Sequence, residues 1–443
     1  EKVYKQGFNI NTPINLELQK LATNSLREGL IAYDKRKGWH GTLINKNYNP
    51  KWFEDLENYE LEKSIDWKIA IVKKVNKFSA EIETKDKLEG IIEYNDITWT
   101  KKDFDELIQV GDVVYVKNIL NNKYSLKQIP KINGGIVVMD PYTGRVLALS
   151  GGFSFRNSEF NRATQALRQP GSAFKPFVYI SALKEGYTPS TLILDAPYVV
   201  DQGPGLPKWK PANYTEEFYG LTTMRTGIEK SRNLMTVRLA DKIGIEKILI
   251  TAKDFGISKY LENQLSMSLG SGLVTLLDIT NAYGIIANGG KKIEPKIITS
   301  IYSKDGKKIY SSNSKICNFC KLDKIIDHEI PKLLNTNKKI IDSKYTYQIT
   351  SMMEGVIKRG TAKKLKDLNV PIAGKTGTTN DNKDAWFIGY TPNLVIGIYV
   401  GYDSPKSLGF KQTGSSVAVP IFEILAKKIN INSSKIPFRV PSG

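Results

Sequence analysis

The sequence predicts an α+β protein with a small all-β insertion, and three patterns carry this prediction. Residues 13–35 repeat apolar side chains at helical spacing, residues 64–130 contain several short alternating strands, and residues 134–402 begin and end with strands around a helical middle. With 443 residues and 41% apolar content, the chain is long enough for two or three folded domains.

The first element is a helix over residues 13–35. Pro13 stands near its start and Gly38 beyond its end, as expected of helix boundaries. Its apolar side chains recur at spacings of three and four and therefore share one face: Leu18, Leu21, Ala22, Leu26, Leu30 and Tyr33. We expect this helix to pack against the main domain and to carry no chemistry.

Residues 64–130 alternate apolar and polar side chains, as at Trp67, Ile69 and Ile71. Asn121-Asn122 supplies a hairpin turn between two of these strands. Several short strands in such a length predict a small barrel or sandwich, with the oligonucleotide/oligosaccharide-binding (OB) barrel as a candidate. Because the segment has no recognisable stacking motif, a structural or docking role is favoured over nucleic-acid binding.

The main domain begins at residues 134–149, which predict a strand, a turn at 140–144 and a second strand. Helical patterns fill much of 172–290, and the polar stretch 303–315 predicts a loop or an exposed hairpin. Strands return at 370–376, 384–390 and 394–402.

Composition excludes several function classes. The net charge of +19 is spread along the chain, so a compositional bias explains it better than a nucleic-acid-binding patch. Cys317, Cys320 and His328 supply at most three of the four ligands that zinc prefers, so we expect no metal. With two histidines, a Ser-His-Asp triad is not favoured, and no apolar run approaches the roughly 18 residues of a membrane span.

The first candidate for chemistry is Ser172, which follows Pro170-Gly171 at the expected start of a helix. Lys175 lies three residues later, on the same face of one helical turn. A serine hydroxyl needs a base to become a nucleophile, and a lysine can serve if burial or a second cation lowers its pKa. The spacing alone is weak evidence, because it recurs at Ser181/Lys184 and Ser312/Lys315.

The second candidate is Ser231-Arg232-Asn233. On a loop, the first and third side chains can point into one cleft, where a hydroxyl relays a proton and an amide binds both a lysine and a peptide. Ser231 could equally be a helix N-cap.

The third candidate is the strand segment around Lys375. Lys375 offers a cation for a carboxylate, Thr376 and Thr378 offer hydroxyls, and Gly377 lets a backbone or a ligand approach closely. A phosphate-binding loop is disfavoured because Asn369 stands where its first glycine should be.

The three elements in this order form the set found in penicillin-binding proteins and class A β-lactamases. The chain resembles a class A, 1a-type high-molecular-weight penicillin-binding protein. The resemblance covers nearly all of residues 134–429 and extends to the helix and the barrel; Ala173 departs from it, where members often have Ser or Thr. The matching segments are 160–179, 230–239, 266–270, 374–381, 383–392 and 401–403, and Cys317 and Cys320 resemble a cysteine pair of some members.

The resemblance implies three regions. Residues 1–63 would form a linker and a packing helix, and residues 64–130 an inserted OB-like barrel. Residues 131–443 would form a penicillin-binding/β-lactamase-like transpeptidase domain, with an antiparallel sheet flanked by helices.

The resemblance also implies a serine acyl-enzyme mechanism. Ser172 would attack the carbonyl of the penultimate D-Ala of a stem peptide, and Lys175 would take its proton, helped by Lys375. Ser231 would pass a proton to the leaving D-Ala, while Asn233 would hold the donor peptide and orient Lys175.

The same resemblance assigns the substrate contacts. Lys375, Thr376 and Thr378 would hold the terminal carboxylate, with Gly377 allowing close approach. The backbone N–H groups of Ser172 and Thr378 would form the oxyanion hole. No metal or cofactor is expected.

The expected partners are peptidoglycan stem peptides ending in D-Ala-D-Ala and β-lactam antibiotics, which acylate the same serine. An envelope protein is a candidate partner for the barrel, and nucleic acid is not expected. Members carry a membrane anchor and a glycosyltransferase domain, so the chain resembles an excised, soluble portion from the periplasmic face of the inner membrane. Two alternatives remain: hydrolysis by a D,D-carboxypeptidase or β-lactamase, and a non-catalytic β-lactam sensor or scaffold.

Overall fold

The computed structural model describes residues 7–46, 48, 51–201, 205, 207–257, 259–312, 315–317, 333–335, 337–431 and 435–442. These residues divide into two compact units. The large unit comprises the described parts of 1–25, 134–151 and 161–443, and the small unit comprises those of 26–133 and 152–160.

The large unit is built on one five-stranded sheet. Its strand order is β16 (Ala373–Thr378), β17 (Asp384–Tyr390), β18 (Val395–Gly401), β8 (Asn133–Met139) and β9 (Val146–Ser150). β17 pairs antiparallel with both β16 and β18, and β8 pairs antiparallel with β9. Strands from both ends of this region therefore meet in one sheet, as the sequence predicts.

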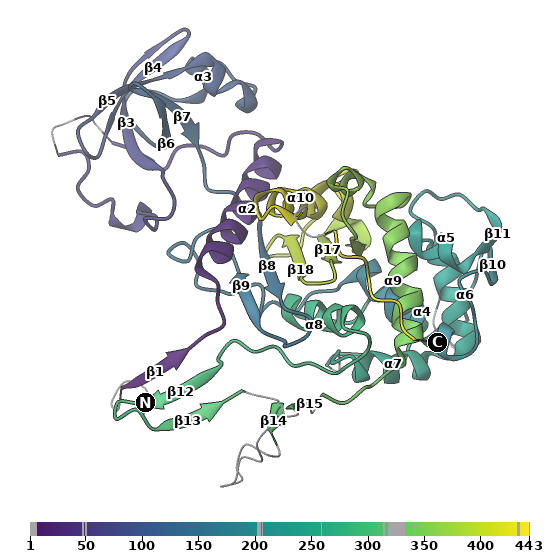
Figure 1. The fold of residues 1–443 in the computed structure, drawn as a ribbon. Helices are drawn as coiled ribbons and strands as arrows, with labels where there is room; N and C mark the ends of the chain where they lie inside the picture. Colours follow the sequence, from purple (N-terminus) through teal and green to yellow (C-terminus); the bar gives the residue numbers. More distant parts are fainter. Residues whose placement is uncertain are drawn as a thin grey trace. The chain divides into compact units, whose positions relative to one another are not determined.

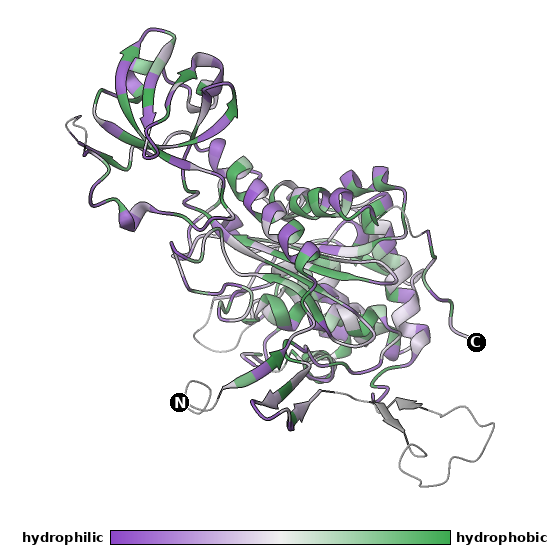
Figure 2. Ribbon diagram, turned by 60° about the vertical axis from the view of Figure 1, so that its left-hand side comes forward, coloured by the Kyte–Doolittle hydropathy of each residue, from purple (hydrophilic) through white to green (hydrophobic). Residues whose placement is uncertain are grey.

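Alternation along β17 gives the sheet two helix-covered faces. Phe387 packs on Phe422 of α10 (Val419–Lys428), with ring centroids 5.0 Å apart. Its neighbours Trp386 and Ile388 point the other way, into a core shared with α4 (Lys175–Lys184), α8 (Leu276–Ala287) and α9 (Ser343–Lys358). Figure 2 shows the resulting hydrophobic colouring of the sheet and of the helices that face it.

The helical middle surrounds α4, which is buried from Lys175 to Leu183. α5 (Met224–Glu229), α6 (Asn233–Ile243), α7 (Ile245–Asp254) and α9 contact it (Figure 1). A two-stranded antiparallel sheet of β10 (Leu192–Asp195) and β11 (Gly220–Thr223) packs beside α6. The helices predicted over 172–290 are confirmed, and α4 is the central one.

The predicted helix over residues 13–35 is confirmed as α2 (Leu16–Lys35). The polar stretch around 303–315 includes an exposed hairpin of β12 (Ser300–Ser303) and β13 (Lys308–Ser311), to which β1 (Phe8–Asn11) adds a third strand. Two short strands, β14 (Lys315–Cys317) and β15 (Leu333–Asn335), pair antiparallel. Among the described residues, no helix combines the length and apolarity needed to cross a membrane.

The small unit contains a closed five-stranded barrel. Its neighbouring strands run β6–β3–β4–β5–β7, and β7 pairs back onto β6; β2 (Ile44–Asn45) adds to β6 from outside. Asn121 and Asn122 turn from β6 into β7 with φ of 42° and 62°, which is the tight hairpin expected from the sequence. The barrel prediction is therefore confirmed; its strands are β3 (Lys68–Asn76), β4 (Ser79–Thr84), β5 (Glu89–Glu93), β6 (Asp112–Leu120) and β7 (Lys123–Lys127), with α3 (Phe104–Leu107) between β5 and β6.

Candidate active site

Ser172 lies in a 3₁₀ turn, Gly171–Phe174, that leads directly into α4. The α-helix begins at Lys175, so Pro176 falls in its first turn, where proline is tolerated. Ser172 is partly exposed to a cavity, whereas Lys175 is fully buried beneath it. The turn thus presents a hydroxyl to solvent and an amine to the interior.

The loop between α5 and α6 carries Ser231 and Asn233. Ser231 adopts the left-handed conformation with φ of 59°, which is unfavourable for a residue with a side chain and is typical of functional loops. Lys175 Nζ donates to the Ser231 carbonyl at 2.8 Å and to Asn233 Oδ1 at 2.6 Å. The loop therefore holds the lysine through two strong acceptors.

A second buried lysine reaches the same loop from β16. Lys375 Nζ donates to Ser231 Oγ at 2.8 Å and to the Thr376 carbonyl at 3.0 Å. Because Lys175 Nζ also lies 3.4 Å from Ser231 Oγ, this one hydroxyl bridges the two lysine amines. The structure thus brings together residues that are far apart in the sequence.

Burial makes both amines unusually acidic. It lowers the pKa of Lys375 to about 7. Burial, and after it the neighbouring Lys375 cation, hold the pKa of Lys175 well below its usual value, while the carboxylate of Asp195 partly opposes this shift. An amine with a lowered pKa can accept a proton near neutral pH, as a general base must.

Close backbone packing joins β16 to the Gly171–Phe174 turn that carries Ser172. A Cβ on Gly377 would lie 2.4 Å from the Pro170 carbonyl oxygen and 3.1 Å from the Ala173 Cβ, so only glycine fits this position. The two threonine hydroxyls that flank it are also held: Thr376 Oγ1 bonds to Thr361 Oγ1 at 2.7 Å, and Thr378 Oγ1 accepts from the Gly414 N–H at 3.1 Å.

These elements border a cavity of about 840 Å³. Five of the eight residues predicted from the sequence line it, and the other three, Lys175, Lys375 and Gly377, lie behind its wall. The lining residues are Ser172, Ala212, Asn213, Tyr214, Thr215, Glu216, Lys230, Ser231, Arg232, Asn233, Leu269, Thr361, Thr376, Thr378, Thr379, Asn380, Asp381, Asn382, Thr413 and Ser415.

Sequence reasoning missed several of these side chains. Asn213 Oδ1 accepts a hydrogen bond from the backbone N–H of Asn233 at 2.8 Å. Thr361 and Ser415 line the cavity near Thr376. None of them belongs to a spaced motif, so no local signal marks them.

Within the described residues, no hydrogen bond joins the Ser172 hydroxyl to Lys175. In this resting arrangement Lys175 is instead bonded to the loop at Ser231 and Asn233. Catalytic hydrogen bonds are often long in unliganded sites and form only when substrate arrives.

Two other Ser-x-x-Lys pairs were singled out by spacing. Ser181 is buried and donates to the Phe177 carbonyl at 2.9 Å, so it supports helix packing. The side chain of Lys315 lies outside the described residues, as do Cys320 and His328, and the Cys317 side chain is likewise not described. Lys375 lies within strand β16, which continues through a short turn into β17, unlike a phosphate loop before a helix.

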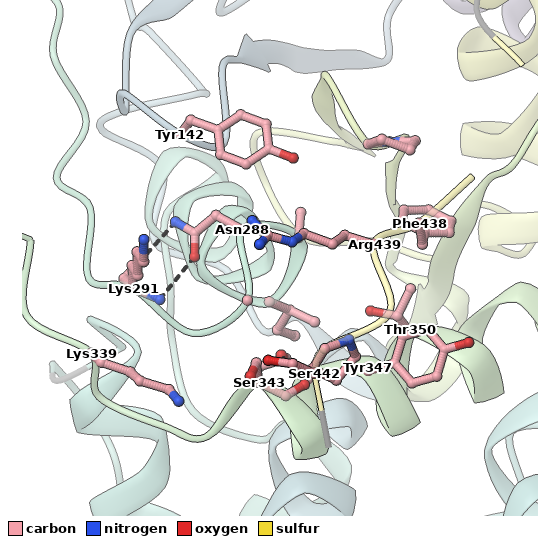
Figure 3. Close-up of a pocket in the computed structure, with 16 residues that line it drawn as sticks. Tyr142, Asn288, Lys291, Lys339, Ser343, Tyr347, Thr350, Phe438, Arg439 and Ser442 are labelled. Atoms are coloured by element: carbon pink, nitrogen blue, oxygen red, sulfur yellow. Dashed lines mark hydrogen bonds between the residues drawn. The ribbon is translucent and has the colours of Figure 1, made fainter. Parts of the chain in front are cut away.

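A separate cavity of about 380 Å³ lies at the start of α9, and Figure 3 shows its lining. Lys291, Lys339 and Arg439 line it together with aromatic side chains, and Asn288 bonds to the backbone of Lys291. It contains none of the eight predicted site residues.

Comparison with known proteins identifies two family matches. Residues 134–427 match the penicillin binding protein transpeptidase domain, and residues 39–132 match the penicillin-binding protein OB-like domain. The chain is 45% identical to Penicillin-binding protein 1A of Rickettsia typhi over 449 aligned residues, which cover 100% of this chain and 57% of that protein. It is 34% identical to Penicillin-binding protein 1A of Pseudomonas aeruginosa, and the alignment covers 95% of this chain and 56% of that protein. The chain therefore spans little more than half the length of these relatives.

Solved structures give the same result. Penicillin-Binding Protein 1A from Haemophilus influenzae superimposes with a TM-score of 0.86 at 29% identity, over 98% of this chain and 68% of that one. The PonA1 protein from Mycobacterium tuberculosis, solved in complex with penicillin V, shares the fold at 20% identity and a TM-score of 0.63. The superposition covers 100% of this chain and 91% of that one. The resemblance inferred from the motifs is confirmed, and the sensor alternative is not favoured.

Proposed function

Because the chain belongs to the penicillin-binding protein transpeptidase family, we propose that it is a D,D-transpeptidase that cross-links peptidoglycan stem peptides through an acyl-enzyme on Ser172. The observation that carries the proposal is the bridge made by the Ser231 hydroxyl between the buried amines of Lys175 and Lys375. Because Lys175 begins the helix one turn after Ser172, the bridge would supply a base and a proton path.

Acylation begins when the stem peptide enters the cavity and Ser172 Oγ attacks the carbonyl carbon of its penultimate D-Ala. Neutral Lys175 takes the hydroxyl proton. The backbone N–H groups of Ser172 and Thr378 donate to the resulting oxyanion; such a donor typically contributes a factor of about 10²–10³ to the rate. The tetrahedral intermediate then collapses and expels the terminal D-Ala, whose nitrogen receives a proton through Ser231.

Substrate binding would use β16 and the Ser231–Asn233 loop, which border the cavity. The Lys375 ammonium and the hydroxyls of Thr376 and Thr378 hold the terminal carboxylate of the donor, and Asn233 holds its amide. The amine of a second stem peptide then attacks the acyl-enzyme carbonyl, and Lys175 takes the amine proton and returns it to Ser172 Oγ as the ester bond breaks. Attack by water instead would give carboxypeptidase side activity, and a β-lactam would acylate Ser172 and remain bound.

In the whole protein, the family resemblance adds a membrane anchor and a glycosyltransferase domain, which would place this site on the periplasmic face of the inner membrane. The OB-like barrel would then be available to an envelope protein.

The test is turnover of a stem-peptide analogue ending in D-Ala-D-Ala, with and without an amine acceptor. Release of D-Ala with a cross-linked product supports the proposal, and the reaction should disappear in Ser172→Ala but persist in Ser181→Ala, whose serine has the same spacing to a lysine. Release without cross-linked product indicates a carboxypeptidase, and a single adduct without release indicates a sensor.

A further inference from the structure

A buried carboxylate lies behind the catalytic loop. Asp195, the last residue of β10, has no exposed surface. Its Oδ1 accepts a hydrogen bond from Asn213 Nδ2 at 2.8 Å. Because a buried charge is costly unless it is paired, its position calls for an explanation.

Asn213 connects Asp195 to the first residues of helix α6. Its Nδ2 is engaged by Asp195, so its Oδ1 faces the helix and accepts the N–H groups of Asn233 at 2.8 Å and Leu234 at 3.3 Å. Within the described residues, Arg232 at the N-cap position gives no side-chain cap. Asn213 therefore caps α6 from a distant segment of the chain.

The same segment also sets the amide of Asn233. Asn233 Nδ2 donates to the Ala212 carbonyl at 2.8 Å, which turns Asn233 Oδ1 toward Lys175 Nζ at 2.6 Å. Asp195 is thus connected to the lysine through Asn213 and Asn233.

The second oxygen of the carboxylate faces the loop itself. Asp195 Oδ2 lies 3.8 Å from Arg232 Nε, and in the described part of the chain neither atom has a hydrogen-bond partner. The Arg232 guanidinium stacks on Tyr219 at 3.3 Å from the ring centroid. Since Arg232 stands between Ser231 and Asn233, the carboxylate holds the loop at two points.

We propose that Asp195 is a positioning residue that, through Asn213 and Arg232, fixes the Ser231–Asn233 loop and thereby holds Lys175 for proton transfer. The inference rests on the proposed function. It assigns catalytic importance to a residue outside the three motifs, at the end of strand β10.

The charge of Asp195 also acts on the lysine directly. The charged groups that face Lys175 are Lys375 from β16, Arg232 from the loop and Asp195 from β10. Burial, Lys375 and Arg232 lower the pKa of Lys175, and Asp195 raises it. Tyr179 on α4 also faces Asp195, and burial keeps its pKa above the usual value, so it stays neutral near pH 7. Loss of the carboxylate charge should therefore make Lys175 a stronger acid.

The test measures the second-order rate of acylation by a labelled penicillin between about pH 5 and 9. In Asp195→Asn, we expect the acid limb of the profile, where the base becomes neutral, to move down by about one pH unit. We also expect the maximum acylation rate of the profile, its plateau, to fall at least about tenfold, because the loop loses the carboxylate that holds it. In Asn213→Ala the charge remains, so the plateau should fall while the limb moves less.

Asp241→Asn is the matched control, because Asp241 is an exposed carboxylate on α6 that bonds to the Tyr198 hydroxyl. Its profile should match the wild type. A folded Asp195→Asn with the wild-type limb and plateau would overturn the inference; if that variant does not fold, an unchanged plateau in Asn213→Ala would do so. Failure of the wild type itself to acylate would instead overturn the proposed function.

Discussion

Replacing Gly377 with alanine should separate β16 from the turn that carries Ser172. The new Cβ would lie 2.4 Å from the Pro170 carbonyl oxygen, 2.9 Å from the Trp386 Cβ and 3.1 Å from the Ala173 Cβ. Two of these three atoms belong to the nucleophile segment and one to the neighbouring strand. No rotamer change can relieve the contact with a backbone oxygen.

The expected effect follows from that distance. Ordinary van der Waals contact begins at 3.4 Å, so β16 and the turn must move apart by about 1 Å. Overpacking of this kind typically costs about 1–3 kcal/mol of stability. A displacement of about 1 Å between reacting groups can lower a catalytic rate by roughly 10²-fold. We therefore expect a modest loss of stability and a much larger loss of acylation.

The assay pairs urea unfolding with the rate of acylation by a labelled penicillin. Gly284→Ala, within α8, is the control, because its nearest contact is the flexible tip of Ile293 at 3.0 Å. That variant should acylate at the wild-type rate. A Gly377→Ala protein with wild-type stability and wild-type acylation would refute the argument that this close approach sets the site.

Three further predictions concern the buried polar groups. Burial lowers the folded-state pKa of Lys375 to about 7, so between about pH 7 and 10 the unfolded chain binds more protons than the folded chain. The stability of the wild type, and with it the melting temperature, should therefore rise with pH in this window. Lys375→Met removes the titrating amine and should flatten this rise. Arg162→Ala should lower the free energy of unfolding by about 2 kcal/mol, because the buried guanidinium donates to both oxygens of Asp403, at 2.7 and 2.5 Å. Tyr283→Phe should cost about 1–2 kcal/mol in urea unfolding, because its hydroxyl donates to the buried Ala173 carbonyl at 2.7 Å.

Each of these has an outcome that contradicts it. Equal pH slopes in the wild type and Lys375→Met would mean that the amine is not titrating in the interior. Arg156→Ala breaks an exposed ion pair and should change the free energy of unfolding by less than about 0.5 kcal/mol. An equally small loss in Arg162→Ala would mean that the buried ion pair contributes no more than the exposed one. A Tyr283→Phe protein as stable as the wild type would show that the Ala173 carbonyl finds another partner.

The strands and the main helices could be predicted from the sequence, because each has its own periodicity. The α2 helix followed from apolar spacing, and the Asn121-Asn122 turn from its residue types. The candidate site could be predicted only as three separate motifs. Their meeting at Ser231 depends on long-range packing, which no local spacing encodes.

The supporting residues could not be predicted for the same reason. Asp195 and Asn213 act through tertiary hydrogen bonds, and neither stands at a characteristic distance from a motif residue. The left-handed backbone of Ser231 is equally invisible, because serine normally avoids that conformation. Gly377 gave partial information. The sequence predicts that it allows a close approach, but it does not tell which backbone segment approaches.

Mass spectrometry of the intact chain after exposure to a labelled penicillin tests whether Ser172 is the nucleophile. We expect one stable adduct on the wild type, located by peptide mapping at Ser172, absent in Ser172→Ala and retained in Ser181→Ala. A folded wild-type chain without an adduct, or an adduct that survives Ser172→Ala, would contradict the assignment of Ser172 as the nucleophile.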